Sequence, residues 1–111
     1  EREAVKLGYD VEAVRVESRT RAHYVEGGGR RVLLKVIADS STGRLLGAQA
    51  VGDDTAFWRV NVVAALLASK ATVWDLFAVD IGYMPLVAPV WDPLIVAARL
   101  LMRRLGTAPR R

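Results

Sequence analysis

The stretch "VLLKVIADSSTGRLLGAQAVG", residues 32–52, decides the fold of this chain. Residues 32–39 form an apolar run rich in β-branched side chains and broken only by Lys35, a composition typical of a strand. "SSTGR" then predicts a turn, with Gly43 where a backbone of positive φ is expected. Residues 45–52 return as a second apolar run. The sequence therefore predicts a β-hairpin at the centre of the chain.

The segments on the N-terminal side extend this hairpin into a sheet. "VEAVRVES", residues 11–18, alternates apolar and polar side chains and predicts a half-buried strand. A short helix over residues 1–8 is expected before it, with Gly8 as its end. Gly47 and Gly52 in the returning strand indicate a bulge or close packing. Three strands in this order predict an antiparallel meander.

The second half of the chain is expected to be helical. Residues 55–69 are apolar around most of a helical circumference, which indicates burial on more than one side. "TVWDLF", residues 72–77, has the Thr and Asp spacing of a capping box. Asp92 followed by Pro93 predicts the start of a last helix that ends near Gly106. The expected fold is an α+β two-layer sandwich, with an antiparallel three- to four-stranded sheet packed against helices.

Length and composition set the class of protein. A chain of 111 residues predicts one domain, and 52% hydrophobic residues indicate burial against something besides its own core. The absence of Cys excludes disulfides, thiolate metal sites and a cysteine nucleophile within the chain, and it fits a cytoplasmic protein. Proline and charged residues interrupt the most apolar run, so no membrane span is expected. The chain does not begin with Met, and we interpret it as a piece of a longer protein.

The formal net charge of +4 raises a second class of function. Arginine accounts for much of it, in two groups: Arg19, Arg21, Arg30 and Arg31 around one loop, and Arg103, Arg104, Arg110 and Arg111 at the C-terminal end. No helix-turn-helix, zinc-finger or RNA-binding signature accompanies them. A free-standing basic interaction or nucleic-acid-binding domain is thus the alternative, while solvated arginines are the simpler interpretation.

The residues alone predict no catalytic group. His23 is the sole histidine, and the spacing of the carboxylates predicts no metal site. The triplet Gly27–Gly29 precedes a strand rather than a helix and lacks the lysine of a phosphate-binding loop. By composition and spacing, the chain is an interface-rich α+β domain.

A family resemblance covers the chain from Ala4 to Leu101. The segments that carry it are "GYDVEAVRV", "RAHY", "LLKVIAD", "TGRLLGAQAVG", "RVNVVAALLA", "TVWDLFAVDIGYMP" and "PVWDPL". In this order and spacing they resemble the C-terminal interface (dimerisation) domain of FAD-dependent pyridine nucleotide-disulfide oxidoreductases. The resemblance implies a homodimer whose FAD and NAD(P)H are bound mainly by nucleotide-binding domains of the parent chain. It also implies that this fragment is inactive by itself.

One loop indicates the branch of that family. "GYMPLVAPVWDP" lacks the His-Pro and Glu of the glutathione-reductase-like and lipoamide-dehydrogenase-like members. It is similar to the Tyr-Ala-Pro-Pro loop of the coenzyme A-disulfide reductase, NADH oxidase and NADH peroxidase branch, with Tyr83 and Pro85 matching and Met84 and Leu86 departing. "HYVEGG" likewise resembles the Tyr-Tyr-Pro-Gly segment of coenzyme A-disulfide reductases, with Tyr24 on the motif.

The resemblance implies roles for these residues. Tyr83 and Tyr24 would be catalytic, reaching the redox cysteine and flavin of the partner subunit, with Met84 and Pro85 near that flavin. The competing interpretation is two tyrosines that pack at an interface with satisfied hydroxyls. Coenzyme A disulfide is the candidate substrate, and oxygen chemistry stays open.

The partners and ligands follow from the same interpretation. On charge alone, the phosphates of coenzyme A would be bound by Arg19, Arg21 and Arg59. No nucleic acid, membrane or metal partner is expected.

Overall fold

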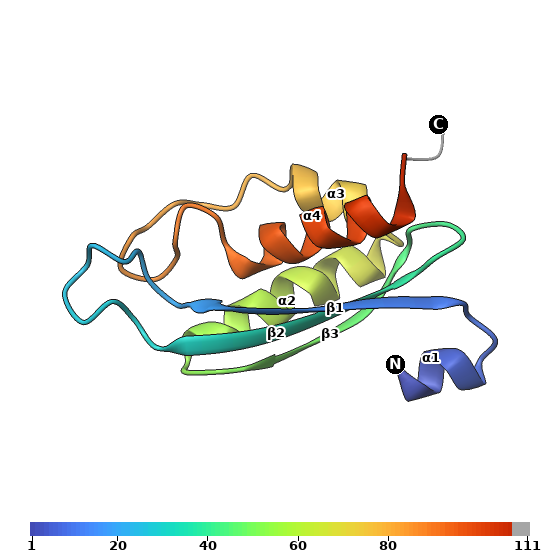
Figure 1. Cartoon of the computed structure of the whole chain (residues 1–111), viewed down its shortest axis with the longest axis horizontal. Coiled ribbons are helices and arrows are strands. Elements are labelled where there is room, and N and C mark those ends of the chain that lie inside the picture. Colours follow the sequence, from blue (N-terminus) through green and yellow to red (C-terminus); the bar gives the residue numbers. More distant parts are fainter. Residues whose placement is uncertain (108–111) are drawn as a thin grey trace.

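The computed structural model describes residues 1–107 and packs an antiparallel sheet against helices in two layers (Figure 1). The elements follow one another in this order: α1 (Arg2–Lys6), β1 (Val11–Arg19), β2 (Arg31–Asp39), β3 (Leu45–Val51), α2 (Thr55–Ala68), α3 (Val73–Ala78) and α4 (Pro93–Leu105). The predicted two-layer α+β sandwich is confirmed. Arg110 and Arg111 of the basic C-terminal group lie outside the described residues.

The three-stranded sheet has the order β1-β2-β3, the predicted meander. Both pairs of strands are antiparallel. The register shifts once, because Ile37 lies opposite Gly47 while Ala38 lies opposite Leu45. Leu46 is therefore the extra residue of a β-bulge beside Gly47, as the glycine indicated.

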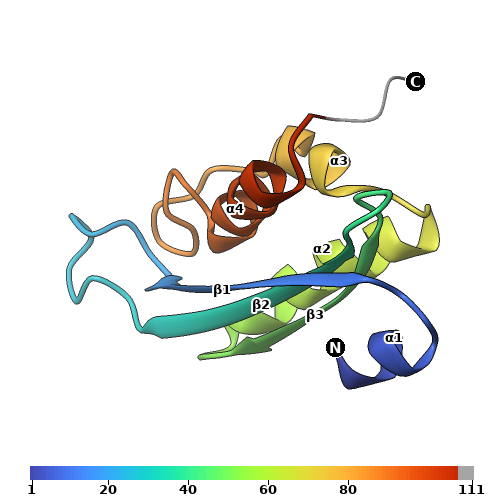
Figure 2. The same ribbon diagram turned by 45° about the vertical axis from the view of Figure 1, so that its right-hand side comes forward.

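The core lies between the sheet and helices α2 and α4, which cover the same face, and α3 packs against α4 (Figures 1 and 2). Alternate residues of the strands supply the sheet side of this core, among them Val14, Val16, Leu34 and Val36. Helix α1 lies on the opposite face, where Glu1 forms an ion pair with Lys35. One face of the sheet is thus covered by the core helices, and the other face carries only α1 within the described residues.

The helix starts follow the local sequence. Thr72 and Asp75 form both bonds of the predicted capping box at α3. Asp92 accepts a hydrogen bond from the backbone N–H of Leu94 over 2.9 Å, and Pro93 is the first residue of α4. Because these signals depend on neighbours in the sequence, they could be predicted.

Helix α2 leaves part of its apolar surface uncovered. Val63 is buried against the sheet, whereas Phe57 is 72% exposed on the other side. Within the described residues, the apolar surface of helix α2 is therefore buried on the side of Val63 and exposed on the side of Phe57. Among residues 1–107, no helix is both long enough and apolar enough to cross a bilayer.

Candidate functional site

Two loops meet at one end of the sandwich. Residues 20–30 connect β1 to β2, and residues 79–92 connect α3 to α4. The two loops lie side by side in both ribbon views (Figures 1 and 2). The backbone N–H of Ala22 donates a hydrogen bond to the carbonyl oxygen of Pro85 over 3.0 Å. This bond fixes the loops to one another.

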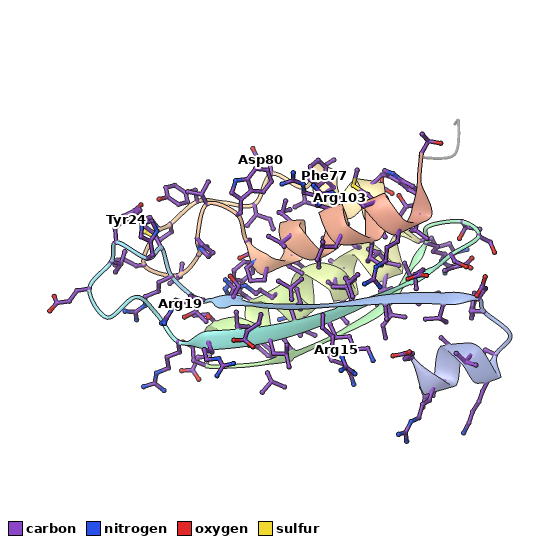
Figure 3. All side chains as sticks on the ribbon, in the orientation of Figure 1. Arg15, Arg19, Tyr24, Phe77, Asp80 and Arg103 are labelled. Atoms are coloured by element: carbon purple, nitrogen blue, oxygen red, sulfur yellow. The ribbon has the colours of Figure 1, made fainter. Side chains whose placement is uncertain are left out.

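The two tyrosines singled out by the sequence meet at this junction. The hydroxyl of Tyr24 is hydrogen-bonded to that of Tyr83, although 59 positions separate them in the chain. Tyr24 points outward at the loop end of the molecule (Figure 3). Tyr24 is 63% exposed and Tyr83 54% exposed, so another molecule can reach both phenols. The ring of His23 stands edge-on to that of Tyr24, with centroids 5.6 Å apart.

This contact changes the acidity of one phenol. The hydrogen bond with Tyr24 raises the pKa of Tyr83 above its ordinary value, and partial desolvation raises the pKa further. A phenol already ionises only near pH 10. Tyr83 therefore keeps its proton, and can donate it in a hydrogen bond, throughout the physiological range.

A tight turn follows Tyr83 and holds it. The carbonyl oxygen of Met84 accepts hydrogen bonds from the N–H groups of Val87 (2.9 Å) and Ala88 (2.8 Å). Ala88 is buried, whereas Met84 and Leu86 are exposed on the outside of the turn. The loop is thus a folded structure with an apolar outer surface.

Behind the loop lies a buried ion pair that the sequence analysis did not predict. The guanidinium of Arg59 contacts the carboxylate of Asp92 through Nη2 at 2.8 Å and Nε at 3.0 Å. Both side chains are almost fully buried. Arg59 also donates to the backbone oxygen of Thr55 over 3.0 Å and to its hydroxyl over 3.1 Å. The sequence predicted Asp92 as the start of the last helix, but it did not predict that Asp92 pairs with Arg59.

The arginines proposed for phosphate binding divide into two groups. Arg19 and Arg21 are exposed and line a groove of about 490 Å³ together with His23, Tyr24 and Trp91. The structure brings this pair of arginines to the tyrosine junction. Nη1 of Arg19, at the end of β1, also donates to the carbonyl of Gly29 in the 20–30 loop over 3.1 Å.

Arg59, in contrast, is 0% exposed, and its donors face protein acceptors. In this arrangement its guanidinium is enclosed by the protein, unlike those of Arg19 and Arg21.

The base of the 20–30 loop is organised by the carboxylate of Asp53, which precedes the start of α2 by two positions. Asp53 accepts hydrogen bonds from the backbone N–H of Thr55 (3.0 Å) and from the hydroxyl of Thr20 (3.3 Å). The hydroxyl of Thr20 accepts in turn from the N–H of Arg30 over 3.1 Å. The hydrogen bonds that Thr55 donates to Asp53, above all the one from its hydroxyl, lower the pKa of Asp53. This network closes the loop that carries Tyr24.

Positive charge does not gather on one element. Arg15 and Arg19 lie on β1, with Arg19 at its loop end, and Arg103 lies on α4 (Figure 3). Proteins that bind nucleic acid concentrate such residues on one face or along one helix. Within residues 1–107, no group of three His, Asp or Glu side chains is placed to hold a metal ion.

Comparisons with known proteins agree with this architecture. Residues 1–94 match the family described as pyridine nucleotide-disulphide oxidoreductase, dimerisation domain. The NAD(P)H coenzyme A polysulfide/persulfide reductase of Pyrococcus horikoshii is 48% identical over 101 residues, which are 91% of this chain and 22% of that protein. The chain thus spans about a fifth of the length of this curated relative.

Solved structures have the same fold. The NAD-dependent persulfide reductase of A. fulgidus superposes with a TM-score of 0.86 at 31% identity, over 94% of this chain and 19% of that one. Reduced CoADR-RHD of Bacillus anthracis superposes with a TM-score of 0.87 at 27% identity, over 95% of this chain and 19% of that one. With most of its residues matched by the family model, the chain belongs to the pyridine nucleotide-disulphide oxidoreductase dimerisation domain family.

Proposed function

We propose that this chain is the C-terminal dimerisation domain of a longer flavoenzyme, a homodimer in which it presents Tyr24 and Tyr83 to the active site of the partner subunit. The observation that carries the proposal is the contact between the two phenol hydroxyls at an exposed loop junction. The family of the chain supports it. So do the names of relatives, which describe reductases of persulfides that use NAD or NAD(P)H.

The proposed substrate is a disulfide or persulfide of coenzyme A. With the disulfide, the S–S bond would break as two electrons from NAD(P)H arrive by way of FAD, and uptake of one proton would give NAD(P)⁺ and two thiols. The exposed Arg19 and Arg21 would bind phosphate groups of the coenzyme, because guanidinium groups match phosphate oxygens. Both lie in the groove beside Tyr24, within reach of one extended ligand.

The phenols would act as hydrogen-bond donors to the leaving sulfur. A cysteine thiol has a pKa of about 8.5 and a phenol one of about 10, so full transfer of the phenol proton to a cysteine thiolate is unfavourable. The raised pKa of Tyr83 increases this difference. Tyr83 would thus stabilise a developing thiolate by a charge-assisted hydrogen bond while keeping its own proton. The thiolate then takes its proton from water.

The apolar surface of the loop would pack against the partner subunit. Met84, Leu86, Val90 and Trp91 are all more than half exposed, a concentration of apolar side chains that is typical of an interaction site. Met84 and Pro85 would lie at the edge of the partner's flavin.

Other domains of the parent would hold FAD and NAD(P)H. The glycine triplet of this chain leads into strand β2 rather than into a helix, unlike a dinucleotide-binding loop. We place the enzyme in the cytoplasm, since the chain has no Cys and so no disulfide bonds of its own.

Replacing the phenols tests the proposal. In the full-length protein, Tyr83→Phe and Tyr24→Phe should leave flavin content and reduction of the flavin by NAD(P)H unchanged. Reoxidation by coenzyme A disulfide, followed by stopped-flow absorbance, should slow by about 100- to 1,000-fold, the range expected for losing one donor to a developing charge. Tyr9→Phe is the matched control, because Tyr9 lies between α1 and β1. Unchanged reoxidation in the double variant would overturn the proposed role.

A further inference from the structure

Arg59 and Asp92 form an ion pair whose burial demands an explanation other than stability. Side-chain exposure is 0% for Arg59 and 3% for Asp92. Removing two charges from water costs several kcal/mol per ion, and apolar residues of similar volume often do as well or better. A buried ion pair is therefore weak evidence of stabilisation. The ion pair instead fixes the relative orientation of the groups it joins, because the N–H donors of a guanidinium form a rigid planar fork whose geometry admits few arrangements of their acceptors.

The fork of Arg59 joins three parts of the chain. Nη1 donates to Thr55 in the first turn of α2, Nε and Nη2 donate to the carboxylate of Asp92 at the start of α4, and Nη2 also lies 3.5 Å from the carbonyl oxygen of Val87. Val87 belongs to the loop that carries Tyr83. The pair thus connects the tyrosine loop to two helices of the core.

The connection continues from Val87 to the phenol. The N–H of Val87 donates to the carbonyl of Met84 over 2.9 Å, and Met84 directly follows Tyr83. At the other side of the turn, the carbonyl of Pro85 is bonded to Ala22. The turn is therefore held from two directions, by Arg59 from the core and by Ala22 from the neighbouring loop.

We infer that Arg59, oriented by Asp92, is a positioning residue for Tyr83: it fixes the turn of residues 84–88 and so sets where the Tyr83 hydroxyl meets that of Tyr24. The kinetic part of this inference rests on the proposed function. Arg59 touches neither phenol, and its action on the reaction would pass entirely through Tyr83. A shift of about 1 Å in a reacting group is enough to cost up to 100-fold in rate.

Two variants separate positioning from folding. Arg59→Met leaves the Asp92 carboxylate buried without its partner and is expected to destabilise the protein. Arg59→Met combined with Asp92→Asn removes both charges and keeps a side-chain oxygen that can cap α4. The double variant should retain flavin and its dimeric state. Arg104→Met is the matched control, because the ion pair of Arg104 with Glu12 is partly exposed and joins the end of α4 to the start of β1, away from the two loops.

A double-mutant cycle in the full-length protein then measures the coupling. In the wild-type background, Arg59→Met/Asp92→Asn should slow reoxidation by coenzyme A disulfide about tenfold, within the range that misplacement explains. In the Tyr83→Phe background the same pair of changes should slow it less than about twofold, since residues that act as a unit are not additive. Equal slowing in both backgrounds would overturn the positioning role. So would full activity of the variant in the wild-type background.

A spectroscopic measurement keeps this inference distinct from the proposed function. With 3-fluorotyrosine at position 83 of the full-length protein, ¹⁹F NMR follows ionisation of that phenol directly. Losing the contact with Tyr24 should bring the pKa of residue 83 down in the Arg59→Met/Asp92→Asn variant and not in Arg104→Met. An unchanged pKa would overturn the positioning role. If Tyr83→Phe left turnover unchanged, the proposed function alone would fail, and the ¹⁹F titration would still decide where Arg59 acts.

Discussion

The ring of Trp74 occupies the space that a side chain on Gly43 would need. A Cβ atom built on Gly43 would lie 2.0 Å from Cζ3 of that ring. The backbone there has φ +71°, and the carbonyl of Gly43 accepts a hydrogen bond from the N–H of Val73 over 2.9 Å. The turn between β2 and β3 is thereby pressed against the start of α3.

Gly43→Ala should destabilise the chain strongly. The left-handed backbone costs a non-glycine residue about 1–2 kcal/mol, and displacing the indole adds about 1–3 kcal/mol. Denaturant unfolding followed by near-ultraviolet circular dichroism measures the sum. Gly27→Ala is the control, since Gly27 has φ +77° but nothing within 4 Å of its Cβ position. Equal losses in the two variants would show that the indole contributes nothing.

Thr72→Ala should lower the free energy of unfolding by about 1 kcal/mol, the usual effect of losing an N-cap side chain. The hydroxyl of Thr72 accepts from the N–H of Asp75 over 3.3 Å, and the carboxylate of Asp75 accepts from the N–H of Thr72 over 2.8 Å. Thr72→Ser keeps the hydroxyl and should recover most of the loss. Thermal and denaturant unfolding of the two variants check this, and equal destabilisation by Ser and Ala would contradict it.

The raised pKa of Tyr83 predicts how stability depends on alkaline pH. The folded chain holds this proton more tightly than the unfolded chain, so the contribution is fully present below about pH 10. It is lost as pH rises through the higher pKa of the folded state. Tyr24→Phe removes the largest cause of the shift, and it should weaken the fall in stability above pH 10. Unfolding midpoints between pH 8 and 12 measure this, and identical curves for the two proteins would contradict it.

Asp53 predicts the opposite dependence at acid pH. Bonds from Thr55 lower its pKa below the ordinary value of 3.8, so its contribution is present above that pH and is lost as pH falls through the lower pKa of the folded state. Asp53→Asn should flatten this part of the stability profile. Denaturation midpoints between pH 2 and 6 provide the test. The exposed Asp54→Asn is the neighbouring control, and a wild-type profile in Asp53→Asn would rule out this source of acid sensitivity.

Leu86→Asp should weaken association of the full-length protein, because Leu86 is 54% exposed in the apolar loop. A carboxylate buried at an interface without a partner costs several kcal/mol, which corresponds to a loss of about 100-fold or more in affinity. Sedimentation velocity at several concentrations measures the dimer fraction, and Leu86→Met keeps the apolar contact as control. Undiminished association of the Asp variant would exclude this loop from the interface.

The features that the sequence predicted are those fixed by near neighbours. The turn at Gly43, the capping box at Thr72 and the Asp92-Pro93 helix start each depend on residues within a few positions. The bulge beside Gly47 is of the same kind. The strand order followed from three consecutive alternating or apolar runs.

The pairings across the fold could not be derived in this way. Arg59 and Asp92 are 33 positions apart, so no local pattern links them. From sequence alone, an arginine in an apolar helix can equally bind a ligand or form a buried ion pair. The tyrosines came from family resemblance, and that resemblance did not predict that Tyr24 and Tyr83 touch one another. Such contacts depend on how the helices pack on the sheet, which local patterns do not specify.

The bulge at Leu46 has a consequence for self-association through β-sheets. Strand β3 is an edge of the sheet, and a regular edge offers rows of N–H and C=O groups to which a strand of another molecule can add. The extra residue bends and twists that edge, so an incoming strand cannot match its hydrogen-bonding groups along the whole length. The irregularity next to Gly47 therefore makes the β3 edge a poor template for the addition of a strand from another molecule.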